Sequence, residues 1–225
     1  MFTGIIQTIG KITAAEKISG DIRLTIAANG LSDETIELGD SIACNGVCLT
    51  VIEQYHSGKD LMLKFDVSQE SIAHSLIADW QANTAINMEL AMLPTTRFGG
   101  HIVSGHVDGV GEIAKMKSDA RSWRIWFKAP SQLIKYIAAK GSITIDGISL
   151  TVNGIENDVF HVNIVPHTMQ VTTMGERQQG DKVHLEIDVV ARYLERLLQD
   201  RSNGINTNTS SGITESLMQE HGFMK

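Results

Sequence analysis

Small polar side chains stand at matching places on two short segments of this sequence. Cys48 and Thr50 alternate with apolar residues, and Ser149 and Thr151 alternate in the same way farther along the chain. Because successive side chains of a strand point to opposite faces, each segment presents its thiol or hydroxyl groups on one face. For one segment alone, incidental hydroxyls on a half-buried strand would be the simpler interpretation. The repetition favours a polar binding wall in both.

Each of the two segments lies inside a longer stretch that occurs twice. The first copy is SIACNGVCLTV at residues 41–51, and the second is SITIDGISLTV at residues 142–152. An Asn-Gly or Asp-Gly corner between alternating residues is typical of a tight β-hairpin. Further pairs match in the same order: GIIQTIGKI with GHVDGVGEI, FDVSQES with VNIVPHT, and INMEL with VHLEI. The chain therefore consists of two related halves.

Short β-patterned segments separated by Gly and Asn/Asp turns predict an all-β fold with a small antiparallel barrel or sandwich in each half. A closed barrel is favoured because it has no exposed sheet edge. We expect an N-terminal barrel over residues 1–91 and a C-terminal barrel over residues 92–188. FTGIIQTIGKI at residues 2–12 is one of the β-patterned segments, and SQLIKYIAAK at residues 131–140 is expected to form a short helix. A second helix is expected over residues 189–201, followed over residues 202–225 by a polar tail whose end could form a short helix.

The helix expected over residues 189–201 carries one apolar stripe. The period changes at Val189, and the stripe consists of Val190, Ala191, Leu194, Leu197 and Leu198. In aqueous solution such an apolar stripe must be buried against another protein surface. It would pack either on a barrel or on another subunit.

Composition excludes several classes of protein. The chain has 225 residues, a formal net charge of −7 and 42% hydrophobic residues. An acidic chain lacks the basic footprint of nucleic-acid binding. No apolar run reaches the roughly 18 residues of a membrane span, and the start does not resemble a signal peptide. With only Cys44 and Cys48, a disulfide scaffold is not expected either, so the sequence predicts a cytoplasmic protein without nucleic-acid or membrane partners.

One cluster suggests a metal site but does not support it. His101, His106 and Asp108 are close in sequence. A spacing of five residues would place the two imidazoles on opposite faces of a regular strand. A metal site also needs further ligands, and no other ligand cluster is evident. We therefore predict polar roles for these residues and no metal.

Six motifs together resemble the riboflavin synthases of the α-chain type: MFTGII, NGVCLTV, GGHIVSGHVDG, KGSITIDGISLTV, VNIVPHT and EHGF. The resemblance covers essentially the whole chain. It implies two six-stranded antiparallel Greek-key barrels, a C-terminal α-helix and a homotrimer assembled through that helix. It also implies that the N-terminal barrel of one subunit meets the C-terminal barrel of another to form the active site.

The activity implied by the resemblance is the last step of riboflavin biosynthesis. Two molecules of 6,7-dimethyl-8-ribityllumazine react, and one donates a four-carbon unit to the other. The products are riboflavin and 5-amino-6-ribitylaminouracil, and no cofactor is expected. A partnership with lumazine synthase is a further expectation. The alternative function is a non-catalytic antenna protein that binds lumazine or flavin.

The resemblance also implies site residues. Those linked to catalysis are Phe2, Cys48, His106, Ser149 and Asp188. The implied N-half substrate pocket contains Gly4, Ile5, Ile6, Ser41, Cys48, Leu49, Thr50, Asp66, Val67, Ser68, Gln69, Glu70 and Ser71. The implied C-half pocket contains Gly105, His106, Val107, Ser149, Leu150, Thr151, Asn163, Ile164, Val165, Pro166, His167 and Thr168. Asp146 is a further substrate-binding residue, and Lys140 would reach the ligand of a neighbouring subunit.

Two steps of the implied chemistry each have more than one candidate group. The 7-methyl group of the lumazine is acidic because its anion delocalises into the ring, so either His106 or a bound water could act as the base. The nucleophile at C7 could be water, Ser149 or Cys48. The sequence departs from the family at WQANTAINME, where the family usually has a Gly-Asp turn; Gly180-Asp181 keeps that turn in the second half.

Overall fold

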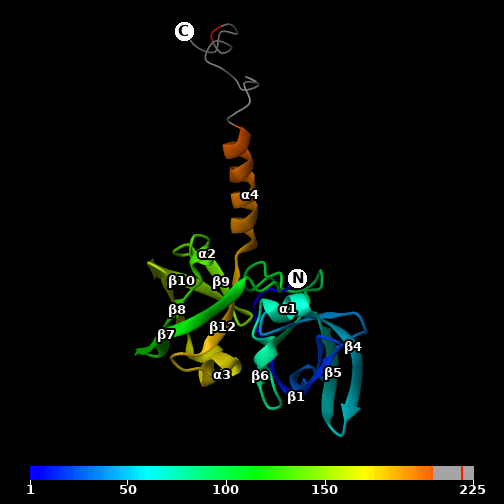
Figure 1. Ribbon diagram of the computed structural model, residues 1–225. Helices are drawn as coiled ribbons and strands as arrows, with labels where there is room; N and C mark the ends of the chain where they lie inside the picture. The colour runs from blue at the N-terminus through cyan, green and yellow to red at the C-terminus, as the bar shows by residue number, and fades with distance from the viewer. Residues whose placement is uncertain (205–218, 220–225) are drawn as a thin grey trace. The chain divides into compact units, whose positions relative to one another are not determined.

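A computed structural model describes residues 1–204 and residue 219. It contains two closed six-stranded antiparallel barrels and a C-terminal helix, as predicted (Figure 1). Both barrels belong to one compact unit, Met1–Val189, and a second unit begins at Val190. The short helix expected at the end of the tail lies outside the described residues.

The first barrel is formed by the first half of the chain. Its strands are β1 Thr8–Ile18, β2 Asp21–Ala27, β3 Ser41–Cys44, β4 Val47–Ser57, β5 Asp60–Val67 and β6 Ala85–Leu90. Around the barrel they follow the order β1-β2-β5-β4-β3-β6, a Greek-key arrangement. Short helical turns η1 Asn29–Leu31, α1 Gln69–Ala73 and η2 Ile77–Asp79 connect them.

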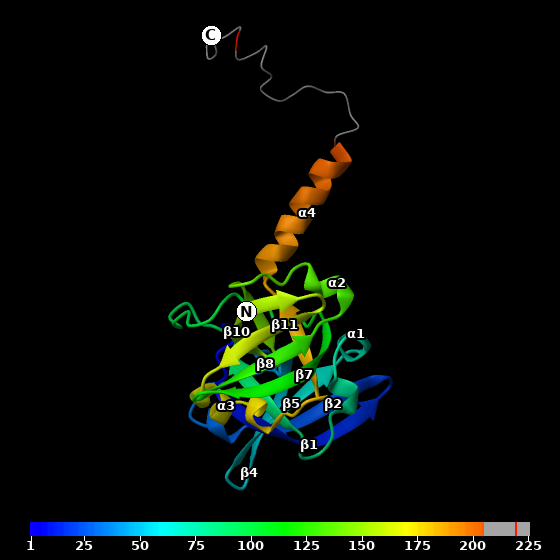
Figure 2. The ribbon, with the colours of Figure 1, turned by 90° about the vertical axis from the view of Figure 1, so that its left-hand side faces the viewer.

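The second barrel repeats this topology. Its strands are β7 Gly109–Asp119, β8 Ser122–Lys128, β9 Ser142–Ile145, β10 Ile148–Glu156, β11 Val159–Ile164 and β12 Lys182–Ile187. Their order around the barrel is β7-β8-β11-β10-β9-β12, and Figure 2 shows β7, β8 and β11 as neighbours in its wall. The helical pieces are α2 Ser131–Ile134, α3 Pro166–Val171 and η3 Thr173–Glu176, and α4 Val189–Gly204 follows the barrel.

Each barrel has its own apolar core. In the first barrel, Leu24, Leu63 and Phe65 are fully buried. In the second, Phe127 and Phe160 stack with ring centroids 5.5 Å apart. These residues alternate with outward-facing ones along their strands, which is why the two-residue periodicity of the sequence predicted the fold class.

The two repeated hairpins have the predicted tight corners, and the corners meet. Asn45 and Gly46 have φ of 44° and 81°, and Asp146 and Gly147 have φ of 46° and 82°. Positive φ at both central positions defines the turn that suits a twisted hairpin. A Cβ on Gly46 would lie 2.9 Å from the backbone nitrogen of Gly147. The two turns are therefore in backbone contact where the barrels join.

The loop that departs from the family keeps the conformation of its counterpart. Asn83 has φ of 77° and Gly180 has φ of 94°. The N–H of Asn83 donates to the carbonyl of Ile12 at 2.8 Å, and that of Gly180 donates to Ile113 at 2.9 Å. Asn tolerates the left-handed region better than most residues, so the substitution leaves the turn intact.

One expectation about local structure was wrong. The β-pattern of FTGIIQTIGKI predicted a strand from Phe2 onwards, but β1 begins at Thr8. Residues 2–6 contact the other half of the molecule instead, and Phe2 forms an isolated bridge with Val103. The pattern is apolar here because the segment is packed between barrels and not because it lies in a sheet. The helix expected over residues 131–140 is likewise only the single turn α2.

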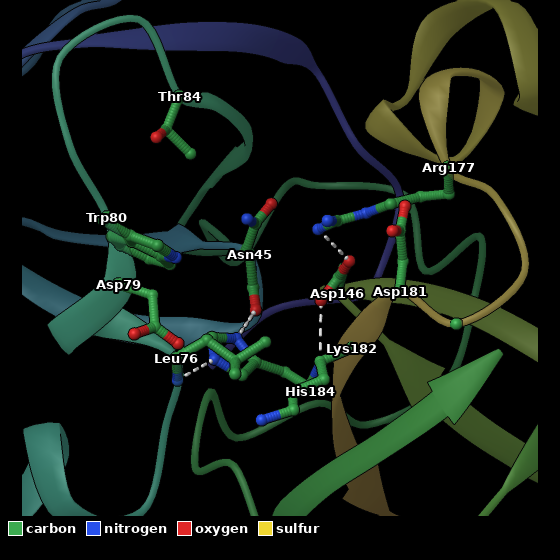
Figure 3. Close-up of a pocket in the computed structure, with 11 residues that line it drawn as sticks. Asn45, Leu76, Asp79, Trp80, Thr84, Asp146, Arg177, Asp181, Lys182 and His184 are labelled. Carbon is green, nitrogen blue, oxygen red and sulfur yellow. Dashed lines mark hydrogen bonds and ion pairs between the residues drawn. The ribbon is translucent and has the colours of Figure 1, made fainter.

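A buried histidine links the barrels. His184 on β12 accepts a hydrogen bond at Nε2 from the N–H of Leu76 at 2.7 Å, and its Nδ1 lies 2.8 Å from the carbonyl oxygen of Asn45 (Figure 3). Because a backbone N–H only donates and a carbonyl only accepts, the ring must be neutral with its proton on Nδ1. Burial lowers the pKa of His184, with nearby Asp146 acting in the opposite direction.

We predict that His184 makes the stability of the fold depend on pH. A histidine with a lowered pKa in the folded state is protonated more readily when unfolded, so the free energy of unfolding should fall as pH drops below about 6.5. His184→Gln should reduce this slope by up to about 1.4 kcal/mol per pH unit. Urea unfolding between pH 5 and pH 8 measures it. His56→Gln, which removes an exposed histidine, is the matched control and should leave the slope unchanged.

Candidate functional site

The polar face of each hairpin strand lies on the outside of its barrel. Leu49 on β4 and Leu150 on β10 point into the two cores, whereas Cys48 and Ser149 are half-buried. Thr50 and Thr151, two residues further along, are exposed on the same faces. The predicted polar walls are therefore outer walls, and any ligand bound to them would lie beside a barrel and not inside it.

The two barrels exchange the segments that precede their first strands. The N–H of Cys48 donates to the carbonyl of Gly105 at 2.8 Å, and the N–H of Ser149 donates to the carbonyl of Gly4 at 2.8 Å. A pair of hydrogen bonds between Phe2 and Val103 joins the two segments. Residues 2–6 thus lie beside the second hairpin, and residues 103–107 lie beside the first.

Within this chain the exchange places the predicted residues of each segment beside the hairpin of the opposite half. The resemblance implied that Gly4, Ile5 and Ile6 share a pocket with Cys48, but within this chain they lie beside Ser149, and Ile6 packs against the core of the second barrel. Gly105–Val107 lie beside Cys48, and Val107 packs against the first core. The sequence could not reveal the exchange because the two halves match each other position by position.

The exchange creates a pocket beside the first barrel. It has a volume of about 190 Å³ and is lined by Val47, Cys48, Glu70, Ser71, His74, Ser75, Gly105, His106 and Val107. The lining brings one thiol, one carboxylate, two imidazoles and two hydroxyls together. His74 lies 3.2 Å from the carboxylate of Glu70. Groups of this kind can donate and accept hydrogen bonds around a polar heterocycle and can move a proton.

Glycine is required where the exchanged segments cross the hairpins. Gly4 and Gly105 have φ of 77° and 80°. A Cβ on Gly105 would lie 2.6 Å from the Cβ of Cys48, and one on Gly4 would lie 2.6 Å from the Cβ of Ser149. Both the backbone conformation and the close approach exclude a side chain. Each glycine therefore fixes the distance between its segment and a predicted site residue.

A second cluster surrounds Ser149. Nδ1 of His101 lies 2.7 Å from Oγ of Ser149, and Nε2 lies 3.2 Å from Oγ1 of Thr144. Burial lowers the pKa of His101, and the charge of Asp188 acts in the opposite direction. A neutral imidazole bonded to a hydroxyl can accept its proton, which makes Ser149 the better nucleophile or hydrogen-bond donor. His101 was not among the predicted site residues.

Two buried carboxylates hold the exchanged segments. Glu89 on β6 accepts hydrogen bonds from the backbone N–H groups of Thr3 and Gly4, and Glu186 on β12 accepts them from Ser104 and Gly105. Burial raises the pKa of both carboxyl groups, and the hydrogen bonds act against this rise. The shared glutamate of INMEL and VHLEI, a charged residue between apolar ones at the same place in both halves, was the signal that could have found them.

Asp146 has a different environment from the other predicted site residues. Its carboxylate is fully buried and accepts from Arg177 at 2.7 Å and from the N–H of His184 at 2.8 Å. It therefore faces the junction of the barrels. That junction also contains a cavity of about 430 Å³, lined in part by Trp80, Asp146 and Arg177 (Figure 3).

The remaining predicted site residues lie mostly around the ends of β5 and β11. Asp66 is paired with Arg23 at 2.7 Å, Val67 and Ile164 are in the cores, and Ser68 caps α1. Half-buried Ser41 stands opposite Thr50. Gln69 begins α1, exposed Asn163 and Val165 precede α3, and Pro166, His167 and Thr168 form its first turn. Lys140 is exposed, with φ of 67°.

Two kinds of feature are absent from the described residues, 1–204 and 219. These residues contain no group of three or more histidine, cysteine, aspartate or glutamate side chains arranged to hold a metal ion. Their helices also include none with the length and apolar character needed to span a membrane.

Comparison with known proteins assigns the fold to a family. The model of the lumazine binding domain matches twice, at residues 3–91 and 104–188. A riboflavin synthase of Photobacterium phosphoreum is 42% identical over the full length of both chains, and that of Bacillus subtilis is 36% identical over 99% of this chain and all of its own.

A solved structure shows the same fold at lower sequence identity. The crystal structure of LumP complexed with 6,7-dimethyl-8-(1'-D-ribityl) lumazine superposes with a TM-score of 0.73 at 25% identity. The superposition covers 83% of this chain and 99% of that one. With one domain match on each barrel and full-length similarity to curated riboflavin synthases, the chain belongs to the lumazine-binding-domain family, among the riboflavin synthases.

Proposed function

We propose that the protein catalyses the riboflavin synthase reaction, in which one molecule of 6,7-dimethyl-8-ribityllumazine transfers a four-carbon unit to a second molecule of the same compound. The products are riboflavin and 5-amino-6-ribitylaminouracil. The observation that carries the proposal is the preservation of both outer walls, with Cys48 beside one exchanged segment and Ser149 beside the other. A reaction between two copies of one molecule needs two related binding sites.

Positioning of the two substrates is expected to supply most of the rate acceleration. Two large rings held face to face react as if at very high concentration, an effect of up to about 7–11 kcal/mol in favourable systems. The substrates exchange carbon between themselves, so neither oxidation nor reduction by an added group is needed. The rigid glycine crossings at Gly4 and Gly105 support this view, because they fix each segment against its hairpin.

Proton transfer requires only weak acids and bases. Removal of a proton from the acidic 7-methyl group of one lumazine is assigned to His106 or to a water held in the pocket beside Cys48. Addition at C7 of the other lumazine is assigned to water, Ser149 or Cys48. His101 supports Ser149 as a candidate, because its Nδ1 is within hydrogen-bonding distance of the hydroxyl. Phe2 and Asp188 complete the proposed catalytic set.

The active protein is proposed to be a homotrimer in the cytoplasm. On α4, the side chains of Val190, Leu194, Leu197 and Leu198 are each more than half exposed in the single chain. An apolar stripe of this kind favours a partner of the same chain, as in a helical bundle. Contact between barrels of neighbouring subunits would bring two lumazines face to face, with Lys140 reaching the neighbour's ligand. A lumazine synthase is a further proposed partner because it would supply the substrate.

We predict turnover of lumazine without any additive. Purified protein mixed with 6,7-dimethyl-8-ribityllumazine alone should form one riboflavin for every two lumazines consumed, measured by absorbance and chromatography. The stoichiometry follows from carbon exchange between two identical molecules. Binding of one lumazine per chain without turnover would contradict the proposal and identify a non-catalytic antenna protein.

We predict that the apolar stripe of α4 controls assembly and activity together. Leu194→Lys places a charge where a leucine side chain would be buried, which costs about 1.5–3 kcal/mol or more per subunit. Sedimentation should show dissociation into single chains, with activity lost in parallel. Gln199→Lys introduces the same side chain on the opposite face of the helix and should leave the trimer intact. Equal effects of the two variants on assembly would show that the apolar stripe is not part of the assembly surface.

We predict that His106→Ala lowers kcat by about 10²- to 10⁴-fold, the usual contribution of a general acid or base, and does not abolish turnover. Stopped-flow measurement of riboflavin formation on assembled protein tests this. His74→Ala removes the other imidazole of the same pocket and should have a smaller effect on kcat. Complete loss of turnover in an assembled His106→Ala protein would show that proton transfer outweighs positioning.

A further inference from the structure

Two buried glutamates make the same contacts to the two exchanged segments. Glu186 Oε1 accepts from the N–H and the hydroxyl of Ser104 at 2.7 and 2.6 Å, and Oε2 accepts from the N–H of Gly105 at 3.1 Å. Glu89 Oε1 accepts from the N–H and the hydroxyl of Thr3 at 2.8 and 2.7 Å, and Oε2 accepts from Gly4 at 2.9 Å.

Each glutamate reaches the site on the other barrel through a single residue. Glu186 belongs to β12 of the second barrel, but the Gly105 that it holds accepts the hydrogen bond from Cys48 on the first barrel. Gly105 and the following His106 and Val107 line the pocket beside Cys48. Glu89 belongs to β6 of the first barrel and holds Gly4, which accepts the hydrogen bond from Ser149 on the second.

Packing alone does not explain a carboxylate at these positions. Glu89 and Glu186 are only 4% and 3% exposed, and an apolar side chain would avoid the cost of burying a charge. A carboxylate with two oxygens can receive several neutral donors at once and fix the direction of two consecutive backbone N–H groups. It holds a glycine in the left-handed conformation at the closest approach to a hairpin.

We propose that Glu89 and Glu186 are positioning residues that act across the barrel boundary. Glu186 orients the wall of the pocket beside Cys48, and Glu89 orients the segment beside Ser149. Each barrel therefore controls the substrate geometry of the other. This inference rests on the proposed function for the identity of the ligand, but the orientation of the segments can be tested without it.

The test compares Glu186→Gln with Glu89→Gln. The amide keeps one oxygen for Ser104 or Thr3 but turns an NH₂ group toward the glycine N–H, so it releases the glycine specifically. Alkylation of Cys48 by iodoacetamide, followed by mass spectrometry of the peptide, reports on the pocket beside that thiol. Cys44 is fully buried and burial raises its pKa. Absence of alkylation at Cys44 therefore shows that the protein has stayed folded during the experiment.

We expect Glu186→Gln to change the rate of Cys48 alkylation and Glu89→Gln to leave it unchanged. With lumazine as protecting ligand, Glu186→Gln should raise the concentration for half-protection on the order of tenfold, the scale of a charged hydrogen bond. In a Ser149→Cys background the pattern should reverse at the new thiol. Glu89→Gln should change the alkylation rate of the cysteine at position 149, and Glu186→Gln should not. In steady-state assays of riboflavin formation, both Gln variants should raise KM. The rise should be larger than in a variant that is equally destabilised but keeps the hydrogen bonds of the exchanged segments.

Other outcomes separate the inference from the proposed function. Equal effects of the two variants at Cys48, or none, would overturn crossed positioning. Lack of protection of wild-type Cys48 by lumazine would overturn the ligand assignment, while the alkylation rates would still decide the inference. If a Gln variant does not fold, Ser104→Ala and Thr3→Ala remove one hydrogen bond each and should show the same crossed pattern.

Discussion

The structure depends on two backbone hydrogen bonds, one from the hairpin of each half to the exchanged segment of the other. Through them Cys48 meets Gly105 and Ser149 meets Gly4 at 2.8 Å. Two barrels of this size would each bury a modest share of their surface alone. The exchanged segments turn them into one compact unit and place the polar outer walls next to backbone that the other barrel supplies. Each candidate site is thus built by both halves.

The electrostatics of the junction follow from the same arrangement. The neutral ring of His184 and the carboxylates of Asp146, Glu89 and Glu186 are buried where the halves meet, and each is satisfied by hydrogen bonds. Buried polar groups with all their partners present favour one arrangement over others, because any shift leaves a group unsatisfied. The junction therefore favours one arrangement of the two halves.

Much of the fold was predictable from the sequence because it rests on local signals. The corners at Asn45-Gly46 and Asp146-Gly147, the two-residue alternation and the change of period at Val189 are each encoded within a few residues. The exchange was not predictable, since a repeat aligns Gly4 with Gly105 and contains no information on which hairpin each one meets. A polar role was predicted for His101, but its contact with Ser149 was missed for a related reason: it joins residues 48 positions apart.

The interlocking of the halves also bears on how such a chain can arise and change. The hydrogen bonds that hold the exchanged segments occur in both directions, as in an isologous dimer: Cys48 bonds to Gly105 and Ser149 bonds to Gly4. A single ancestral half could therefore have made the same hydrogen bonds to a second copy of itself before the two became one chain. Once they were joined, Cys48 and Ser149 no longer had to be identical. One half could then specialise while still supplying the wall that its neighbour needs.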